Sequence, residues 1–149
     1  MKNNNVKLLI GRTDIVDFPK LNLLGIHVKI DTGAYTSSFH CHDIKIENNI
    51  LKCQLLDPEH HKFEDVHFEF SEFSQKIVKS SNGQIENRYL IKTEIFIFDQ
   101  IYPIALTLSE RGSMKYPVLL GRKFLSKKFI VDTSKKYISF KNLNTKLTE

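Results

Sequence analysis

The chain has 149 residues, of which 41% are hydrophobic and 26% are charged, and its formal net charge is +5. This length and composition predict one globular domain, residues 1–149, that can bury a core of its own. No apolar run approaches the roughly 18 residues of a membrane-spanning helix, and the first residues lack the apolar region of a signal peptide. Because the sequence holds only two cysteines, Cys41 and Cys53, we expect a cytoplasmic protein with reduced thiols.

The positive charge favours acidic partners, which include acidic peptides and nucleic acids. The lysines and arginines are scattered, however, and the sequence has no arginine-rich tract or aromatic RNA-binding motif. We therefore do not expect nucleic-acid binding.

Alternating and apolar segments predict a chain made mostly of β-strands. In chain order, the expected strands are 6–10, 26–30, 39–46, 50–56, 62–70, 88–98, 101–109, 129–132 and 137–140. The last two are expected to pair with each other. A turn is expected at 47–49, and Asn82-Gly83 is typical of a tight hairpin because both residues tolerate positive φ angles. One short helix is expected at about 122–127, and the polar tail 141–149 is expected to fray. This pattern favours an all-β fold, either a closed barrel or a sandwich.

The segment Lys29–His40, KIDTGAYTSSFH, places a carboxylate at the end of an alternating strand. Gly33 permits a sharp turn in which backbone N–H groups point at the Asp31 carboxylate. The Thr32 hydroxyl is available for a further hydrogen bond. This arrangement suits a catalytic aspartate, whereas a plain turn is the simpler interpretation.

Peptide hydrolysis by aspartates requires two carboxylates that share one proton, since two like charges about 3 Å apart cannot both ionise. The sequence has one Asp-Thr-Gly, and its nearest second copy, Asp132-Thr133-Ser134, lacks the glycine. We therefore expect a homodimer in which Asp31 of each subunit meets at a two-fold axis.

The segments KIDTGAYTSSFH (29–40) and YPVLLGRKFL (116–125) resemble those of retropepsin-like aspartic proteases. The chain is most similar to a bacterial family labelled ATP-dependent zinc protease, which is associated with an ATP-grasp ligase that adds glutamates to a ribosomal protein. Further matching segments are 10–12, 78–93, 106–115 and 129–132, so the resemblance covers nearly the whole chain.

The resemblance implies a small acid-protease barrel in which Asp31 is catalytic and Thr32, Gly33 and Ala34 support its loop. It implies that 119–122 packs beneath this loop. It also implies a substrate-facing hairpin around Ser80–Gly83, with Asn82, Gly83 and Arg88 as candidate contacts. Arg88 and Arg122 are candidates for internal ion pairs or for binding substrate carboxylates. Tyr35 stands where the family usually has an arginine.

The zinc and ATP of the family label have little support in the residues. The sequence has no His-Glu-x-x-His, no Cys-x-x-Cys and no phosphate-binding loop. His40 and His42 share a face of one expected strand and are the best zinc candidates, but no spacing specifies further ligands. We therefore expect no cofactor.

Three hypotheses follow from these observations. The first is a homodimeric aspartic endopeptidase that acts on a peptide or protein, with acidic substrates favoured by the net charge. The second is a non-catalytic binding or adaptor module of a glutamate-ligase system, since fold does not determine function. The third is a zinc-dependent peptidase, as the family label says.

Overall fold

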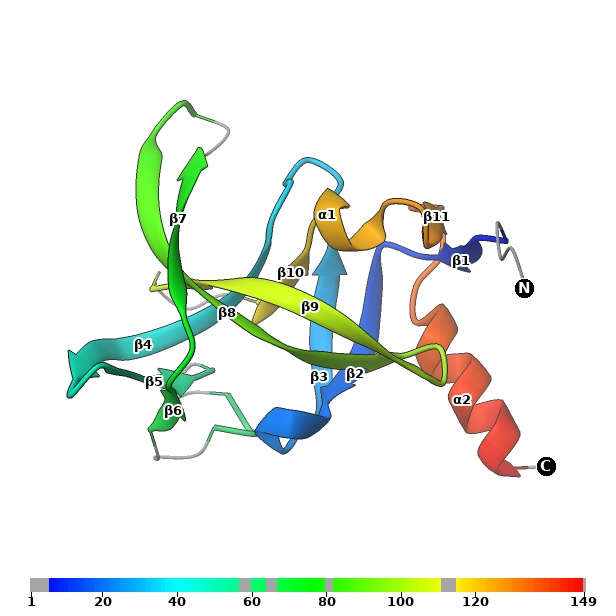
Figure 1. Cartoon of the computed structure of the whole chain (residues 1–149). Helices are drawn as coiled ribbons and strands as arrows, with labels where there is room; N and C mark the ends of the chain where they lie inside the picture. The colour runs from blue at the N-terminus through cyan, green and yellow to red at the C-terminus, as the bar shows by residue number, and fades with distance from the viewer. Residues whose placement is uncertain (1–5, 57–59, 64–66, 80–81, 111–114, 149) are drawn as a thin grey trace, which may run out of the picture.

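The computed structural model describes residues 6–56, 60–63, 67–79, 82–110 and 115–148 and consists mainly of β-strands, as expected (Figure 1). In chain order, the elements are β1 (Leu8–Ile10), β2 (Thr13–Phe18), the 3-10 helix η1 (Pro19–Leu21), β3 (Leu23–Ile30), β4 (Ser37–Glu47), β5 (Ile50–Leu55), β6 (Phe68–Phe70), β7 (Ser74–Lys79), β8 (Ile85–Ile97), β9 (Gln100–Ser109), β10 (Val118–Leu120), α1 (Arg122–Leu125), β11 (Phe129–Val131) and α2 (Ile138–Thr148). None of the helices in this part of the chain has the length and apolar character needed to cross a bilayer.

The larger of two sheets has nine strands and mixes parallel with antiparallel pairs. Its order is β10-β3-β2-β8-β9-β4-β5-β6, and β7 pairs with β8. Strand β10 pairs in parallel with β3 and antiparallel with β4, so the pairings lead from β10 through β3, β2, β8, β9 and β4 back to β10. A separate two-stranded sheet joins β1 to β11 in parallel.

The predicted alternation of 26–30 is present in β3. Ile26, Val28 and Ile30 are buried, whereas Lys29 between them is exposed. Other strands contribute the same kind of inward-facing residue to one apolar core. Its largest fully buried side chains are Phe18, Phe39, Ile10, Ile26, Leu51, Leu55, Leu56, Ile91, Ile95, Ile97, Leu106 and Leu108.

The predicted turn between the strands at 39–46 and 50–56 is also confirmed. Glu47 pairs with Ile50, which leaves Asn48 and Asn49 as a two-residue connection between β4 and β5. Their φ angles of 53° and 62° are positive, as a type I′ hairpin requires. Asparagine tolerates positive φ angles better than most residues, which is the physical reason why Asn48-Asn49 predicted a turn.

Two expected strands differ from the structure. The strand predicted for 62–70 contains only Phe68–Phe70 as strand, and residues 64–66 lie outside the described part. The segment 129–132 forms β11 as expected, but β11 pairs with β1 and not with 137–140.

The strand predicted for 137–140 and the expectation of a single helix were wrong. Of the tail 141–149, which was expected to fray, residues up to 148 belong to a helix, and residue 149 lies outside the described part. Residues 138–148 form the helix α2, which is a second α-helix after α1. The cause is Asp14 on β2, whose carboxylate accepts hydrogen bonds from the N–H groups of Ser139 (3.0 Å) and Phe140 (3.1 Å). A helix starts with N–H groups that have no partner within the helix, and Asp14 satisfies two of them from a distant strand.

Replacing Asp14 with Ala should lower the free energy of unfolding by about 2–3 kcal/mol, because it leaves the buried Ser139 N–H and the partly buried Phe140 N–H of α2 without partners. Asp14 is fully buried. Urea denaturation followed by circular dichroism measures the change. Asp14→Asn is the matched comparison, since it keeps one acceptor oxygen and should cost less than Asp14→Ala; an equal or larger cost would contradict the capping role.

The charge of Asp14 also predicts a pH dependence. Burial raises the pKa of Asp14 above its ordinary value of 3.8, and the backbone N–H groups of Ile15, Ser139 and Phe140 oppose this shift. Because the folded state then binds the proton more tightly, the contribution of Asp14 to stability is complete below pH 3.8 and is lost as the pH rises through the folded-state pKa. The stability difference between wild type and Asp14→Asn should therefore shrink as the pH rises from about 3.5 to about 7. A difference that stays constant across these pH values, or grows, would contradict the raised pKa.

Candidate functional site

Asp31 directly follows β3 and begins an exposed loop at the end of the sheet where α1 lies (Figure 1). Its backbone N–H donates to Leu120 O of β10 at 2.9 Å, so the neighbouring strand fixes its position. The Gly33 N–H donates to Asp31 Oδ1 at 3.1 Å, and the Ala34 N–H donates to Asp31 O at 3.2 Å. Asp31 and Ala34 are half-buried, while Thr32 and Gly33 are exposed. The carboxylate is therefore held by its own loop and remains accessible to solvent.

The segment 119–122 packs against the Asp31 loop, as the resemblance implies. The Gly121 N–H donates to the buried Ser37 Oγ at 3.0 Å, which ties β10 to the start of β4. A Cβ on Gly121 would lie 2.7 Å from Thr36 O and 2.8 Å from Tyr35 O, so only glycine allows this close approach. The N–H groups of Arg122 and Lys123, at the start of α1, donate to Ala34 O and Tyr35 O, both at 2.9 Å.

The side chain of Arg122 also contacts the loop. Its Nη1 donates to Thr32 O at 3.0 Å, and its guanidinium lies 5.7 Å from the centroid of the Tyr35 ring. In the described residues Arg122 therefore binds a backbone carbonyl and an aromatic ring. This differs from the ion pair that was one of its predicted roles.

A second region of the chain repeats this geometry. The Asp132 N–H donates to Ile10 O at 2.9 Å, as Asp31 donates to Leu120. Arg12 Nη1 donates to Thr133 O at 3.1 Å, as Arg122 donates to Thr32. A Cβ on Gly11 would lie 2.3 Å from Lys135 O, which is a close approach like that of Gly121. An apolar residue followed by Gly-Arg occurs both at 10–12 and at 120–122. This repeat is the feature of the sequence that could have predicted the relationship between the two regions.

The two loops differ at the carboxylate. Asp132 Oδ1 accepts hydrogen bonds from the Ser134 N–H at 2.9 Å and from Ser134 Oγ at 2.6 Å. These two bonds lower the pKa of Asp132. In the Asp31 loop, the equivalent position is Gly33, which provides an N–H but no hydroxyl. The carboxylate of Asp132 is thus engaged by its own loop more fully than that of Asp31.

The hairpin predicted around Asn82-Gly83 joins β7 to β8, with Lys79 opposite Ile85. Gly83 has a φ of +85°, and Asn82 Oδ1 accepts from the Gln84 N–H at 3.3 Å; Ser80 and Ser81 lie outside the described residues. Figure 1 shows this hairpin extending from the body toward the side on which the Asp31 loop lies.

The β7–β8 hairpin carries exposed apolar side chains and a paired arginine. Ile77 and Ile85 are 69% and 71% exposed. Arg88 Nη2 donates to Glu86 Oε2 at 3.1 Å, so this arginine forms an ion pair within β8.

His40 and His42 lie on β4 with ring centroids 5.9 Å apart, so the expected shared face is present. No group of three His, Cys, Asp or Glu side chains that could hold a metal occurs in the part of the chain that the structure describes. A zinc site takes three or four protein ligands, so within the described residues His40 and His42 are an incomplete set.

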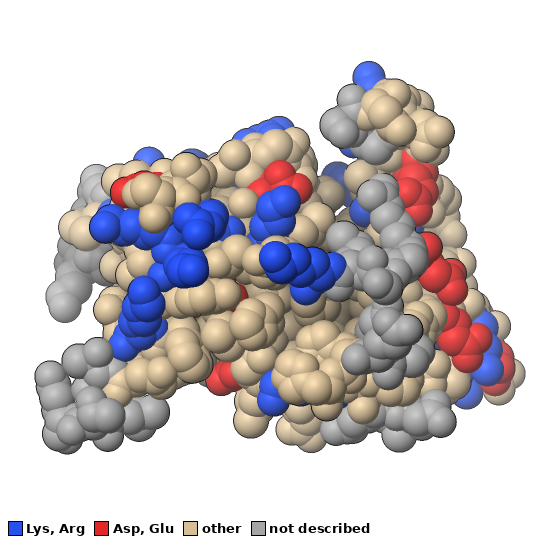
Figure 2. Space-filling model, turned by 180° about the vertical axis from the view of Figure 1, so that it is seen from behind, with Lys and Arg blue, Asp and Glu red and all other residues tan. Residues whose placement is uncertain are grey.

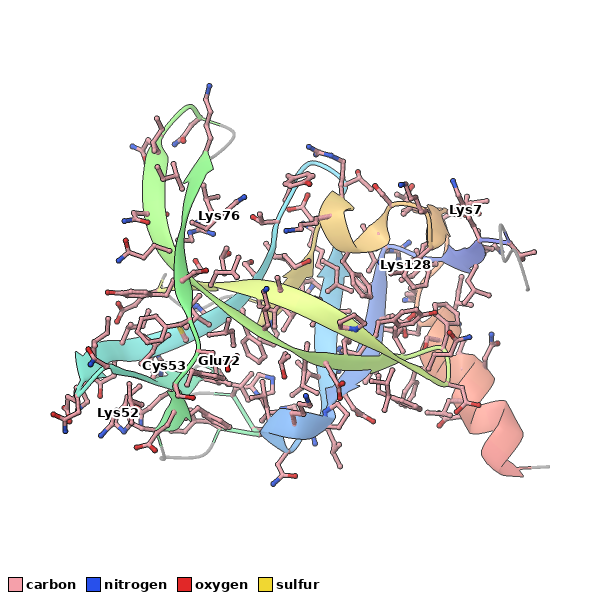
Figure 3. All side chains as sticks on the ribbon, viewed as in Figure 1. Lys7, Lys52, Cys53, Glu72, Lys76 and Lys128 are labelled. Atoms are coloured by element: carbon pink, nitrogen blue, oxygen red, sulfur yellow. The ribbon has the colours of Figure 1, made fainter. Side chains whose placement is uncertain are left out.

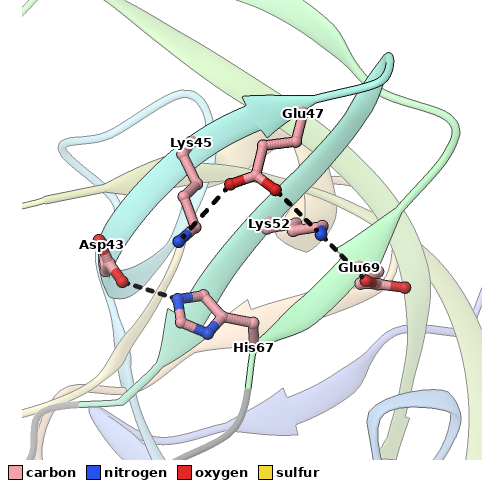
Figure 4. Close-up of polar contacts among 6 residues, drawn as sticks. All are labelled: Asp43, Lys45, Glu47, Lys52, His67 and Glu69. Atoms are coloured by element: carbon pink, nitrogen blue, oxygen red, sulfur yellow. Dashed lines mark hydrogen bonds and ion pairs between the residues drawn. The ribbon is translucent and has the colours of Figure 1, made fainter.

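The side chains of His67, Cys41 and Cys53 lie in different environments. His67 Nε2 lies 2.7 Å from Asp43 Oδ2, within a surface group of charges in which Lys52 contacts Glu47 and Glu69 (Figure 4). Cys41 and Cys53 are both buried and unbridged, and Figure 3 shows Cys53 in the β4–β5–β6 part of the sheet. The contact with Cys53 and burial raise the pKa of the Cys41 thiol, which makes it a poor nucleophile.

Basic side chains are prominent on the surface. Figure 2 shows lysine and arginine side chains gathered on one face of the molecule. The exposed basic residues in the described chain include Arg12, Lys29, Lys115, Arg122, Lys123, Lys127, Lys135 and Lys136. Of these, Arg122 and Lys123 belong to α1, which contacts the Asp31 loop.

A family model described as "Retropepsin-like aspartic endopeptidase RimB" matches residues 9–142. The chain belongs to this RimB-like family. The match includes the Asp31 loop, the Gly121-Arg122 segment and the repeated loop at 132–134.

Comparisons with individual proteins give further relatives. The chain is 35% identical over 135 residues to a "Probable alpha-L-glutamate ligase" of Shewanella halifaxensis (strain HAW-EB4), a match that covers 88% of this chain and 30% of that protein. A protein of the same name from Shewanella pealeana (strain ATCC 700345 / ANG-SQ1) is 34% identical over 135 residues, with the same shares covered. The chain thus spans less than a third of the length of these curated relatives.

A solved structure shares the fold. It is the crystal structure of a protein of unknown function from Legionella pneumophila subsp. pneumophila str. Philadelphia 1, with a TM-score of 0.69 and 23% sequence identity. The match covers 90% of this chain and 99% of that one. This likeness supports the architecture described above.

Proposed function

We propose that this chain is an aspartic-type peptidase whose active site forms when Asp31 of two copies meets at a two-fold axis. The observation that carries the proposal is the accessible Asp31 carboxylate, held by Gly33 at the end of β3 in a member of the RimB-like family. The cyclic order of strand pairs from β10 back to β10 supports the predicted retropepsin-like barrel.

In the proposed dimer, the second carboxylate comes from Asp31 of the other copy. The related loop at 132–134 directs Asp132 onto its own Ser134 by two hydrogen bonds, whereas the Asp31 carboxylate accepts one. A dimer with two-fold symmetry places identical loops opposite each other without any further sequence requirement.

The chemistry requires one ionised and one protonated aspartate. The ionised carboxylate takes a proton from water while the water oxygen bonds to the carbonyl carbon of the substrate. The protonated carboxyl gives its proton to the carbonyl oxygen, which produces a tetrahedral intermediate. When the carbon–nitrogen bond breaks, the protonated carboxyl gives its proton to the nitrogen and the ionised carboxylate takes a proton from one hydroxyl of the intermediate. An amine and a carboxylic acid leave, and the dyad again holds one proton.

The substrate is proposed to be a peptide with acidic side chains. The β7–β8 hairpin, with Asn82, Gly83 and Arg88, extends toward the side of the Asp31 loop and can cover an extended peptide. The exposed Lys123 beside the loop favours carboxylate groups electrostatically. The glutamate ligases among the relatives make glutamate-rich peptides the first substrates to test.

A binding module that serves a ligase is the second candidate. It is favoured by the observation that the matching region makes up 30% of proteins named as glutamate ligases. A peptidase assay on an internally quenched glutamate-rich peptide, with wild type and Asp31→Asn in parallel, separates the two candidates. Hydrolysis that depends on Asp31 supports the peptidase, and equal signals from both proteins overturn it.

A further inference from the structure

We propose that Arg122 is the positioning residue for Asp31. In this role it holds the Thr32–Gly33 peptide group so that the Gly33 N–H stays on the Asp31 carboxylate. The inference rests on the proposed function, in which the Asp31 carboxylate performs the chemistry.

One peptide group connects Arg122 to Asp31. Arg122 Nη1 donates to Thr32 O at 3.0 Å, and the N–H of the next residue, Gly33, donates to Asp31 Oδ1 at 3.1 Å. The C=O of Thr32 and the N–H of Gly33 belong to the same planar trans peptide and point in opposite directions. Fixing the carbonyl therefore fixes the direction of the N–H. A hydrogen bond to the carbonyl also polarises the peptide and strengthens the N–H as a donor.

The carboxylate depends on this single contact. In the described residues, the Gly33 N–H is the one hydrogen-bond donor to the Asp31 carboxylate. A half-exposed carboxylate with one donor changes its direction when that donor turns. The orientation of Asp31 thus follows from the orientation of the Thr32–Gly33 peptide.

Arg122 is itself held at the loop by two further contacts. Its own N–H donates to Ala34 O at 2.9 Å, and its guanidinium lies over the Tyr35 ring at 5.7 Å from the centroid. An arginine can use its planar group for a directed hydrogen bond and for stacking at the same time. Tyr35 therefore contributes by holding the guanidinium beside the loop.

The second loop makes the same connection and provides an internal comparison. Arg12 Nη1 donates to Thr133 O at 3.1 Å, and the following Ser134 N–H donates to Asp132 Oδ1 at 2.9 Å. The Arg12 N–H donates to Lys135 O at 2.8 Å, as that of Arg122 does to Ala34 O. In both loops, hydrogen bonds thus connect an arginine side chain to an aspartate carboxylate through one peptide group. At Asp132 the Ser134 hydroxyl supplies a second donor, so this carboxylate depends less on its arginine.

The test compares Arg122→Met, Arg122→Lys and the matched control Arg12→Met on the internally quenched glutamate-rich peptide. Arg122→Met keeps an apolar side chain but no donor, and we expect kcat to fall by about 100-fold with KM changed by less than about threefold, because a misdirected reacting group slows the chemical step. Arg122→Lys restores a donor, so its kcat should be about tenfold higher than that of Arg122→Met. Arg12→Met should keep kcat within about twofold of wild type. An equal loss in Arg12→Met and Arg122→Met would overturn the positioning role.

A second readout does not require activity. The amide resonance of Gly33 in NMR spectra reports its hydrogen bond, and we expect it to move upfield in Arg122→Met while the Ser134 amide stays in place. Arg12→Met should move Ser134 and not Gly33. If Arg122→Met does not fold, Arg122→Leu, which also lacks a donor, serves for the same measurement. A Gly33 amide that does not move in a folded, donor-less variant of Arg122 overturns the inference. A shifted Gly33 amide would support the role of Arg122 in orienting the Asp31 carboxylate. If wild type and Asp31→Asn then have equal activity, the proposed peptidase function is overturned while the positioning role stands.

Discussion

Replacing Asp31 with Asn should lower kcat/KM for peptide hydrolysis by about a thousandfold or more. The amide has nearly the size of the carboxylate and keeps an oxygen for the Gly33 N–H, which lies 3.1 Å from Asp31 Oδ1. It cannot take a proton from water or give one to the carbonyl oxygen, and general acid–base catalysis contributes about 10²–10⁴-fold. The measurement is hydrolysis of the internally quenched glutamate-rich peptide across acidic and neutral pH.

The matched control is Asp132→Asn, which makes the same change in the related loop. It should keep activity near that of wild type, because Asp132 is engaged by Ser134 and has no role in the proposed chemistry. Thermal unfolding should show that Asp31→Asn stays within about 0.5 kcal/mol of wild type, as expected for a half-exposed side chain. Loss of activity in Asp132→Asn with none in Asp31→Asn would move the catalytic assignment to the second loop.

The same variant tests whether the site is shared between two copies. If each site needs Asp31 from both subunits, an equal mixture of wild type and Asp31→Asn that exchanges subunits freely should retain about a quarter of the activity of the same total amount of wild type. If one chain held a complete site, about half should remain. Activity assays after unfolding and refolding the two proteins together distinguish these values.

Replacing Gly121 with Ala should lower the free energy of unfolding by about 2–3 kcal/mol and also reduce activity. The new Cβ would lie 2.7 Å from Thr36 O and 2.8 Å from both Thr36 C and Tyr35 O. All three are backbone atoms, so the clash can only be relieved by moving the loop that carries Asp31. Urea denaturation gives the stability change, and the peptide assay gives the effect on the site.

Gly83→Ala is the matched control for this substitution. Gly83 has a φ of +85° and no atom within 4 Å of its added Cβ, so the change costs conformational strain of about 1–2 kcal/mol without a clash. We expect Gly121→Ala to be the more harmful of the two for stability. If Gly121→Ala costs less than Gly83→Ala, the close packing of 119–122 against the Asp31 loop is not important for stability.

The sequence by itself determined the features that depend on near neighbours in the chain. The alternation at 26–30 predicted which residues of β3 are buried, because successive side chains of a strand point to opposite faces. Asn48-Asn49 predicted a tight turn, since asparagine accepts positive φ angles. Asn82-Gly83 predicted a hairpin that is present, but its connection from Lys79 to Ile85 is longer than a tight turn, and of the two residues only Gly83 has a positive φ. The Asp-Thr-Gly motif and its position after a strand likewise identified Asp31 as the leading candidate residue.

Only the tertiary structure decided the features that join distant segments. Residues 138–148 form a helix because Asp14, on β2, satisfies its first N–H groups, and nothing in the local pattern of that segment contains this information. The parallel pairing of β1 with β11 and the contact of Arg12 with Thr133 likewise join the two ends of the chain. A hydrogen bond between residues more than 100 positions apart leaves no local periodicity in the sequence, so these contacts became visible only once the chain was folded.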